Sequence, residues 1–428
     1  MSGGIAALVA LAALTPAPAW TADAKPPKET DISYYYDIFE QSIVRPATRM
    51  CDPSLWVRKV TGQRHEAENV DANDEVRLPS TWWQPRAGFR SVTTAQMLRG
   101  PGTGTGPAPG KWTVTRAKTQ GVTPGFFIKD SQGTRYIIKF DTPACPEMAT
   151  GADVVSSYLF WAAGYNVPHN FVVYFRAESL LIAPDAVATD DKGRKAPMTG
   201  VFLDHLLSRV RREPDGRVRG MASLLLSGKP LGPFEYSGRR RDDPEDMIPH
   251  QHRRELRGYW TLCAWLGHAD SRAPNSLDMW VNDGGRAFVR HYLIDFGSCL
   301  GSGAVAKRSY QTGHEYFIDY GTMARSALTL GLVPAKWEAS EDPDLPSIGF
   351  IDSKTFDPTN WCPDYPNPAF DERTPRDIRW GARIVSGMTD DMIRAAVEKG
   401  RYSDPRATEY LTRVLIERRD KIVKAWLR

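Results

Sequence analysis

Two short polar motifs on either side of a predicted β-hairpin constrain the fold of this 428-residue chain more than any other feature. The motifs read His268-Ala-Asp-Ser-Arg-Ala-Pro-Asn275 and Leu293-Ile-Asp-Phe-Gly297. Residues 277–281 and 288–294 alternate like strands, and the sequence Asn-Asp-Gly-Gly that joins them is a strong hairpin signal. Because a hairpin returns the chain to its starting edge, the fold must bring the polar residues of the two motifs together.

The acidic and amide side chains of these motifs suit phosphoryl transfer from a nucleotide. That chemistry needs an acidic group near the attacking hydroxyl and oxygen ligands for the magnesium ion on the phosphates. Asp270 and Asn275 stand five positions apart on one predicted loop, so the first can face the acceptor while the second faces the metal. Asp295, which the hairpin brings back, can hold the magnesium that bridges the phosphates.

Residues 112–175 predict a small antiparallel sheet with one packed helix. We expect strands at residues 112–117, 126–130, 134–140 and 170–175, and a helix at 152–163 that ends at Gly164. A short turn containing glycine joins the second strand to the third. Lys139 lies on the third strand, and the alternation of side chains places it on the face opposite Tyr136 and Ile138.

The spacing H-x-D-x4-N followed by D-F-G resembles the catalytic loop and the metal-binding motif of protein kinases. The resemblance covers roughly residues 112–310. It is closest to atypical members of the superfamily: HipA-like kinases, spore-coat CotH kinases, secretory-pathway kinases and phosphatidylinositol kinases. It implies an α+β, protein-kinase-like fold with two lobes, a small antiparallel sheet lobe with one helix and a larger, mainly helical lobe.

The same resemblance implies that Lys139 holds phosphates, and kinase-like folds fix such a lysine with an acidic residue on the next helix. Asp153 falls where related proteins carry Glu, and Glu147 is the alternative. Kinases cover the phosphates with a G-x-G-x-x-G loop, whereas this chain offers only Gly121 and Gly125 in the sequence Gly-Val-Thr-Pro-Gly. The cofactors implied are ATP, or another nucleotide, and Mg²⁺.

A second resemblance concerns other parts of the chain. Four segments look like those of an uncharacterised family of exported bacterial proteins, and they are residues 69–75, 146–151, 249–258 and 291–297. This resemblance covers most of the mature chain. It implies the kinase-like fold without an established activity.

The first 24 residues are typical of a secretory signal peptide. Residues 5–14 form an apolar run that is too short to span a bilayer, and small residues in the A-x-A pattern follow at 17–19 and 22–24. From Lys25 onward no stretch approaches the roughly 20 apolar residues of a membrane helix. We therefore expect an exported protein, periplasmic or extracellular, without a membrane span after the signal is removed.

Composition and segments rich in glycine and proline divide the remaining chain. Residues 25–110 form a polar, Pro-rich N-terminal extension, in which residues 100–110 carry five glycines and three prolines and read as a linker. We expect the sheet lobe at residues 111–195 and the helical lobe, with both motifs and the C-terminal helices, at 196–428. The net charge of +4 is too balanced to favour a nucleic-acid partner.

The leading hypothesis is a phosphotransferase that uses a magnesium-nucleotide donor, with Asp270, Lys139 and Asp153 as its catalytic residues and Asn275 and Asp295 as its metal ligands. The acceptor, a protein or a small molecule, is not indicated. A kinase-like protein that binds a ligand without catalysis is the first alternative, since an exported protein meets little ATP. Nucleotidyl transfer on the same fold is the second.

Each of these residues also has a structural interpretation. Lys139 could be a solvated strand lysine, and the acidic and amide residues of the motifs could simply shape loops. His250, His252 and His268 do not have the spacing of a metal site, and we expect His268 to support the backbone of the catalytic loop.

Overall fold

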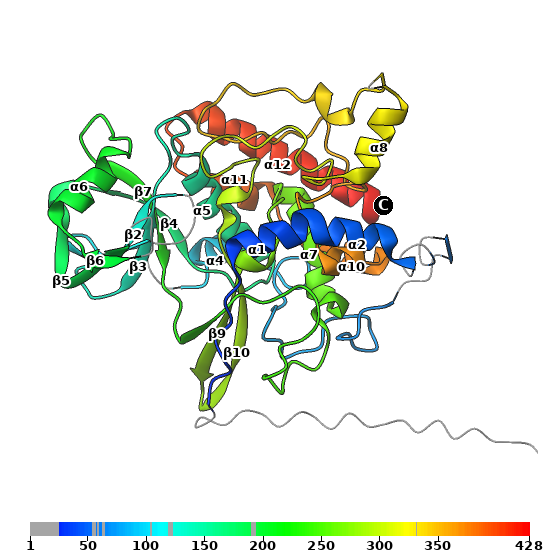
Figure 1. Ribbon diagram of the computed structural model, residues 1–428, viewed down its shortest axis with the longest axis horizontal. Coiled ribbons are helices and arrows are strands. Elements are labelled where there is room, and N and C mark those ends of the chain that lie inside the picture. Colours follow the sequence, from blue (N-terminus) through cyan, green and yellow to red (C-terminus); the bar gives the residue numbers. More distant parts are fainter. Residues whose placement is uncertain are drawn as a thin grey trace, which may run out of the picture.

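The computed structural model shows an α+β protein with two sheets and an extensive helical part (Figure 1). It describes residues 25–53, 57, 60–61, 65–102, 105–118, 123–189, 194–330 and 332–428. The expected signal peptide, residues 1–24, and Gly121 lie outside the described residues. Among the helices of those ranges, none combines the length and the apolar character needed to cross a membrane.

The larger sheet has seven strands in the order β4-β7-β3-β2-β1-β5-β6. Their bounds are β1 Trp112–Ala117, β2 Gly125–Lys129, β3 Arg135–Lys139, β4 Asn170–Phe175, β5 Leu180–Thr189, β6 Lys195–Pro197 and β7 Val218–Leu224. The expected strands and the β2–β3 hairpin are present within a residue or two. The sheet also includes β7, which lies beyond residue 195, the end expected for the sheet lobe.

The expectation of an antiparallel sheet is wrong at one pair of strands. After β4, a short 3₁₀ turn at Ala177–Ser179 redirects the chain, and β5 then runs parallel to β1 along its free edge. Strand β7 inserts antiparallel between β3 and β4. Nearly every residue of β7 is buried, Arg219 among them, so the strand shows no alternation of burial from which its neighbours could be predicted.

Two helices, not the single expected one, pack against this sheet. Helix α5 (Met148–Ala162) lies against β4 and β7 on one face. Helix α6 (Gly200–Ser208) joins the apolar core on the other face, where Tyr136 and Ile138 of β3 are buried. Since side chains alternate along a strand, Lys139 belongs to the α5 face.

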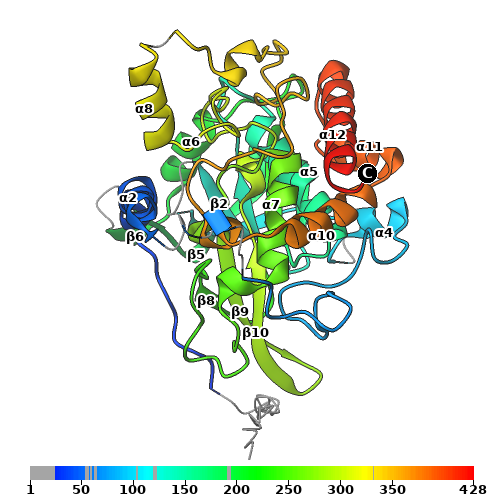
Figure 2. The ribbon, with the colours of Figure 1, turned by 90° about the vertical axis from the view of Figure 1, so that its right-hand side faces the viewer.

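The smaller sheet is an antiparallel hairpin with one added strand, and the hairpin projects from the body of the molecule (Figures 1 and 2). Its strands are β8 (Lys229–Gly232), β9 (Ser276–Asp283) and β10 (Arg286–Leu293). Residue 276 pairs with 293 and 283 with 286, so the predicted hairpin is confirmed. The two polar motifs therefore meet at its open end.

The helical part is built around α7 (Arg254–Leu266), whose residues are all buried. Helix α10 (Pro375–Ser386) crosses α7 closely, because Gly258 leaves room for Trp380 and a Cβ there would lie 2.4 Å from its ring. The other α-helices of the described ranges are α1 Tyr34–Phe39, α2 Arg45–Cys51, α4 Thr94–Arg99, α8 Tyr320–Leu328, α9 Pro368–Asp371, α11 Asp390–Glu398 and α12 Pro405–Trp426, and a π-helical turn, Glu40–Val44, joins α1 to α2. The expected caps of the last two, Thr389 and Asp404, each accept a backbone hydrogen bond.

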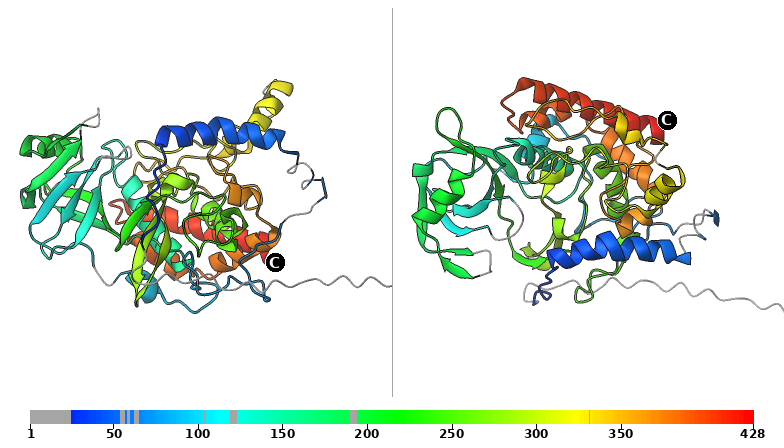
Figure 3. Two further views of the ribbon diagram at one scale, coloured as in Figure 1. Left: turned by 60° about the horizontal axis from the view of Figure 1, so that its bottom comes forward. Right: turned by 45° about the horizontal axis from the view of Figure 1, so that its top comes forward.

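The polar segment before the sheet is an integral part of the packing. Trp83 is buried in the main core, and its indole Nε1 donates to the carbonyl of Ala163 at 2.8 Å. Trp82 stacks on His291 of β10 with ring centroids 3.5 Å apart. Further toward the N-terminus, helices α1 and α2 form one rod that runs along the helical part (Figure 3). The extension thus contributes core residues.

We predict that Trp83→Ala lowers the free energy of unfolding by about 3–5 kcal/mol, the usual cost of removing a buried large aromatic side chain. Urea unfolding followed by circular dichroism would measure the loss. Leu332→Ala, at a side chain that is 81% exposed, is the control and should change stability by no more than about 0.5 kcal/mol. If the two variants were equally stable, the segment around Trp83 would not belong to the folding core.

Candidate functional site

Lys139 forms the centre of a cluster of charges between the large sheet and the hairpin. Its Nζ lies 2.9 Å from Asp295 Oδ1 and 3.3 Å from Asp153 Oδ2. These contacts join the end of β3, the second turn of α5 and the second residue after the end of β10. The expected approach of Lys139 to Asp295 is therefore observed, and Asp153 belongs to the same cluster.

Asp153 is buried and its carboxylate is fully engaged. Oδ1 accepts from Asn170 Nδ2 at 2.7 Å, and the backbone N–H of Phe296 also donates to the carboxylate. Burial raises the pKa of Asp153, and the nearby Lys139 ammonium opposes that rise. Glu147, the alternative partner, instead begins α5 in a left-handed conformation and accepts from the backbone of Ser403. Asp153 is thus the residue that holds Lys139.

The carboxylate of Asp295, unlike that of Asp153, is exposed to solvent. Its side chain is 55% exposed, compared with 3% for Asp153. Its backbone adopts the left-handed conformation with φ of 60°, which is uncommon outside glycine and turns the chain sharply into Phe296. The Lys139 ammonium lowers the pKa of Asp295, so its carboxylate is ionised and open to a ligand.

The first motif forms a loop that ends in a 3₁₀ turn, Ala273–Asn275. Asn275 Nδ2 donates to the backbone carbonyl of Asp270 at 2.7 Å and thereby closes the loop. The backbone N–H of Ile294 donates to the carbonyl of Asn275 at 3.1 Å. Asn275 therefore lies beside the residue that precedes Asp295.

The carboxylate of Asp270 is held by two arginines. Arg272 Nε lies 2.5 Å from Oδ1, and Arg308 Nη2 lies 3.8 Å from Oδ2. Burial tends to raise the pKa of Asp270, but these two guanidinium groups outweigh it and the pKa is lowered. Asp270 is consequently ionised at neutral pH and is a weak base.

His268 is buried behind this loop. Burial lowers its pKa to about 4, so the imidazole is neutral at physiological pH. Its Nδ1 is 3.3 Å from the Ser298 hydroxyl, which follows the second motif. The ring also packs against Phe296. His268 thus connects the two motifs from inside the core.

Gly125 lies directly opposite Lys139 in the β2–β3 ladder. A Cβ at this position would fall 2.2 Å from the carbonyl oxygen of Ile138. Close approach of the two strands therefore explains the glycine without any ligand. Gly121, the other glycine proposed for nucleotide binding, lies outside the described residues.

Lys118 is a second amine at the site, and it was not predicted. It follows β1, and its Nζ donates to the carbonyl oxygen and the hydroxyl of Thr123 at 2.9 and 3.1 Å. Burial lowers the pKa of Lys118 to about 8, assisted by repulsion from Lys139 and opposed by Asp295 and Asp153. In the sequence Lys118 begins a turn-rich link. Only the folded protein connects it with Lys139, because Lys118 lies opposite Gly125 of β2, which in turn lies opposite Lys139 of β3.

The oxygen atoms suited to Mg²⁺ are the exposed carboxylate of Asp295 and the amide oxygen of Asn275, since hard cations prefer oxygen ligands. A separate groove of about 460 Å³ lies beside the hairpin, between Trp82, Arg253 and Phe288, and contains none of the predicted site residues.

Comparison of the chain with protein-family models, with curated proteins and with solved structures finds no match in any of the three.

We predict that Lys139→Met destabilises the protein by about 3 kcal/mol at pH 8, because it leaves the buried Asp153 without its cation. The pKa of Asp153, already raised by burial, should rise further. A raised carboxyl pKa adds stability below the unfolded value of about 4 and loses it as the pH rises through the folded value. The deficit should therefore shrink toward pH 4.

Urea unfolding at several pH values would measure this deficit. The double variant Lys139→Met/Asp153→Asn is the control, because it removes the orphaned charge and should recover most of the stability at pH 8. A deficit of equal size from pH 4 to pH 8 would show that the charge of Asp153 is not its cause.

Proposed function

We propose that this protein is a kinase-like phosphotransferase that uses a nucleotide and Mg²⁺. The observation that carries the proposal is the position of Lys139 between a buried carboxylate, Asp153, and an exposed one, Asp295. A buried partner fixes the amine, while the exposed partner leaves room for phosphates and a metal ion beside it. The arrangement of a sheet whose α5 face packs into the core of a larger helical part supports a kinase-like, two-lobed fold.

In this proposal Lys139 binds the α- and β-phosphates, and Lys118 adds a second positive charge. Asp295 and Asn275 would hold Mg²⁺, which supplies charge neutralisation on the phosphates. Asp270 would orient the acceptor hydroxyl. Because its pKa is lowered, its role is to position the hydroxyl, with proton transfer late in the reaction.

One observation favours the alternative of a kinase-like protein that binds without catalysis. The Asp270 carboxylate already contacts Arg272 and Arg308, so an acceptor hydroxyl would have to compete with two guanidinium groups. Expected export from the cytoplasm, where ATP is abundant, points the same way. The following experiments separate binding from catalysis.

We predict that the wild-type protein binds ATP in a magnesium-dependent manner and that Asp295→Asn abolishes this dependence, since a neutral amide attracts the ion far less than a carboxylate. Isothermal titration calorimetry with and without Mg²⁺ would measure it. Asp283→Asn, at an exposed carboxylate in the hairpin, is the matched control and should bind as wild type does. If the wild type binds no nucleotide at millimolar concentration with Mg²⁺ or Mn²⁺, the site is not a nucleotide site.

The variant Asp270→Asn addresses catalysis in the same series. It should keep nucleotide affinity within about threefold but reduce turnover by roughly a hundredfold, the typical weight of a positioned acid–base group. Transfer of the γ-phosphoryl group is the expected reaction, and transfer of the nucleotidyl group would instead favour nucleotidyl transfer. A binding protein would show neither reaction with any donor.

We predict that nucleotide affinity falls about tenfold between pH 7 and pH 9, because Lys118, with a pKa of about 8, loses its charge and one charge-assisted hydrogen bond. Lys139 keeps its charge in this range, since the two carboxylates outweigh burial and raise its pKa. Lys118→Met should remove the pH dependence, whereas Lys129→Met, at an exposed position on β2, should retain it. An unchanged pH profile in Lys118→Met would exclude contact with the phosphates.

A further inference from the structure

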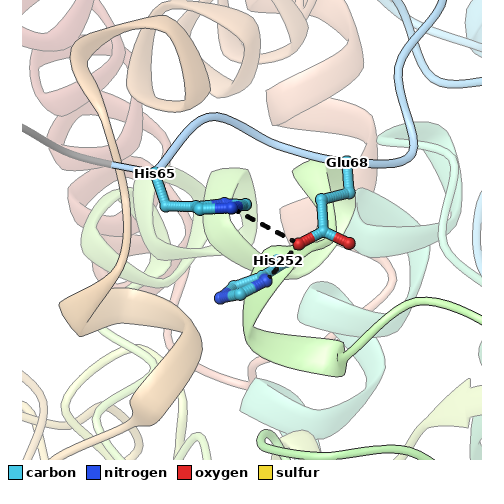
Figure 4. A group of neighbouring side chains, drawn as sticks. All are labelled: His65, Glu68 and His252. Carbon is cyan, nitrogen blue, oxygen red and sulfur yellow. Dashed lines mark hydrogen bonds and ion pairs between the residues drawn. The ribbon is translucent and has the colours of Figure 1, made fainter. Parts of the chain in front are cut away.

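A second group of chemically reactive side chains lies at the other end of α7 from the candidate site. His65 and Glu68 come from the N-terminal segment, and His252 comes from the turn that precedes α7. Figure 4 shows the two imidazole rings one above the other on the same side of the Glu68 carboxylate, both directed at one of its oxygens. One ring nitrogen of each histidine and a carboxylate oxygen of Glu68 all lie within 4.8 Å of one another.

Hydrogen bonding determines which nitrogen of His65 is available. Its Nδ1 lies 2.9 Å from the backbone carbonyl of Glu66, and a carbonyl only accepts, so Nδ1 carries the hydrogen. Neutral His65 therefore directs the lone pair of Nε2 toward Glu68 Oε1, 3.6 Å away. A lone pair and a carboxylate oxygen that face each other at this distance are arranged to share a cation, either a proton or a metal ion.

His252 approaches the same carboxylate oxygen. Its Nδ1 lies 2.5 Å from Glu68 Oε1, and its ring stacks on that of His65 with centroids 4.4 Å apart. Two imidazole nitrogens and one carboxylate oxygen make up the protein ligands of many open zinc sites. We propose that His65, Glu68 and His252 bind a divalent transition-metal ion of the zinc class.

The backbone around these ligands is fixed before any ion binds. The N–H of Glu68 donates to the carbonyl of His252 at 3.0 Å, which ties the two ligands together. The guanidinium of Arg257 donates to the carbonyl of His65 at 2.7 Å and to that of Gln251 at 2.6 Å. The bond from His65 Nδ1 to a carbonyl is the outer-shell contact that metal-binding histidines commonly make.

The site is open, since side chains of His65 and Glu68 are 54% and 37% exposed. An ion can therefore enter from solvent and keep water in its remaining positions. Imidazole ligands favour Zn²⁺ and similar ions, whereas Mg²⁺ prefers oxygen, so this site is distinct in its chemistry from Asp295 and Asn275. It is also distant, because the thirteen residues of α7 span about 20 Å.

The test is calorimetric titration of the full mature chain, without a histidine tag, with ZnCl₂ in the presence of excess Mg²⁺. We expect one zinc ion per chain with micromolar affinity. His65→Gln, Glu68→Gln and His252→Gln should each weaken binding at least about tenfold, since even outer-shell changes commonly do so. His205→Gln, at an exposed histidine on α6, is the matched control and should bind as wild type does.

Co²⁺ binding distinguishes this site from the five thiols, because cobalt held by nitrogen and oxygen lacks a thiolate charge-transfer band. His65 is the most exposed of the three ligands, so His65→Gln should keep the unfolding temperature of the metal-free wild type, which excludes misfolding. Zinc binding that none of the three variants weakens, or a thiolate band with cobalt, would overturn the proposal. Either result would leave the proposal of a nucleotide site at Lys139 unchanged.

Discussion

The contacts of Lys139 with Asp153 and Asp295 hold together parts of the chain that are 156 residues apart. A buried carboxylate such as Asp153 is tolerated only where a cation and hydrogen-bond donors compensate for its lost hydration. Lys139, Asn170 and the backbone of Phe296 provide that compensation from three different elements. The large sheet, α5 and the end of the hairpin therefore have to meet in this arrangement for the charge to be stable.

The register of β3 decides whether these contacts can form. Tyr136 and Ile138 point into the apolar core beneath α6, and the alternate residues Ile137 and Lys139 point toward α5. A shift of one residue would move Lys139 into the apolar core and expose the hydrophobic side chains. Gly125, opposite Lys139, allows the close approach of β2 that fixes this register. The same packing that stabilises the sheet therefore directs the amine to Asp153.

Local signals in the sequence predicted the β9–β10 hairpin, the β2–β3 hairpin that carries Lys139 and the helix caps. These features were predictable because turns, alternation and capping residues act over a few positions. They did not predict the parallel β1–β5 pair or the insertion of β7, which depend on edges formed by distant segments. Asp153 was found by its place on a helix after Lys139. Lys118 and Arg308 were missed, since only the folded chain brings them beside the motifs.

Asp295 and Asp270, at the two ends of the candidate site, differ in how firmly neighbouring charges hold their carboxylates, and the N-terminal segment contributes to this difference. Asp295 is exposed, whereas Asp270 is held by Arg272, which also contacts the buried Asp37 of α1. Arg45, at the start of α2, contacts Glu40 and Glu235 and keeps the same rod in place. A segment that looks like a polar extension in the sequence thus supplies a charged partner to the loop of the first motif. Because Arg272 shares its guanidinium between Asp37 and Asp270, the position of α1 and the orientation of the Asp270 carboxylate are physically coupled.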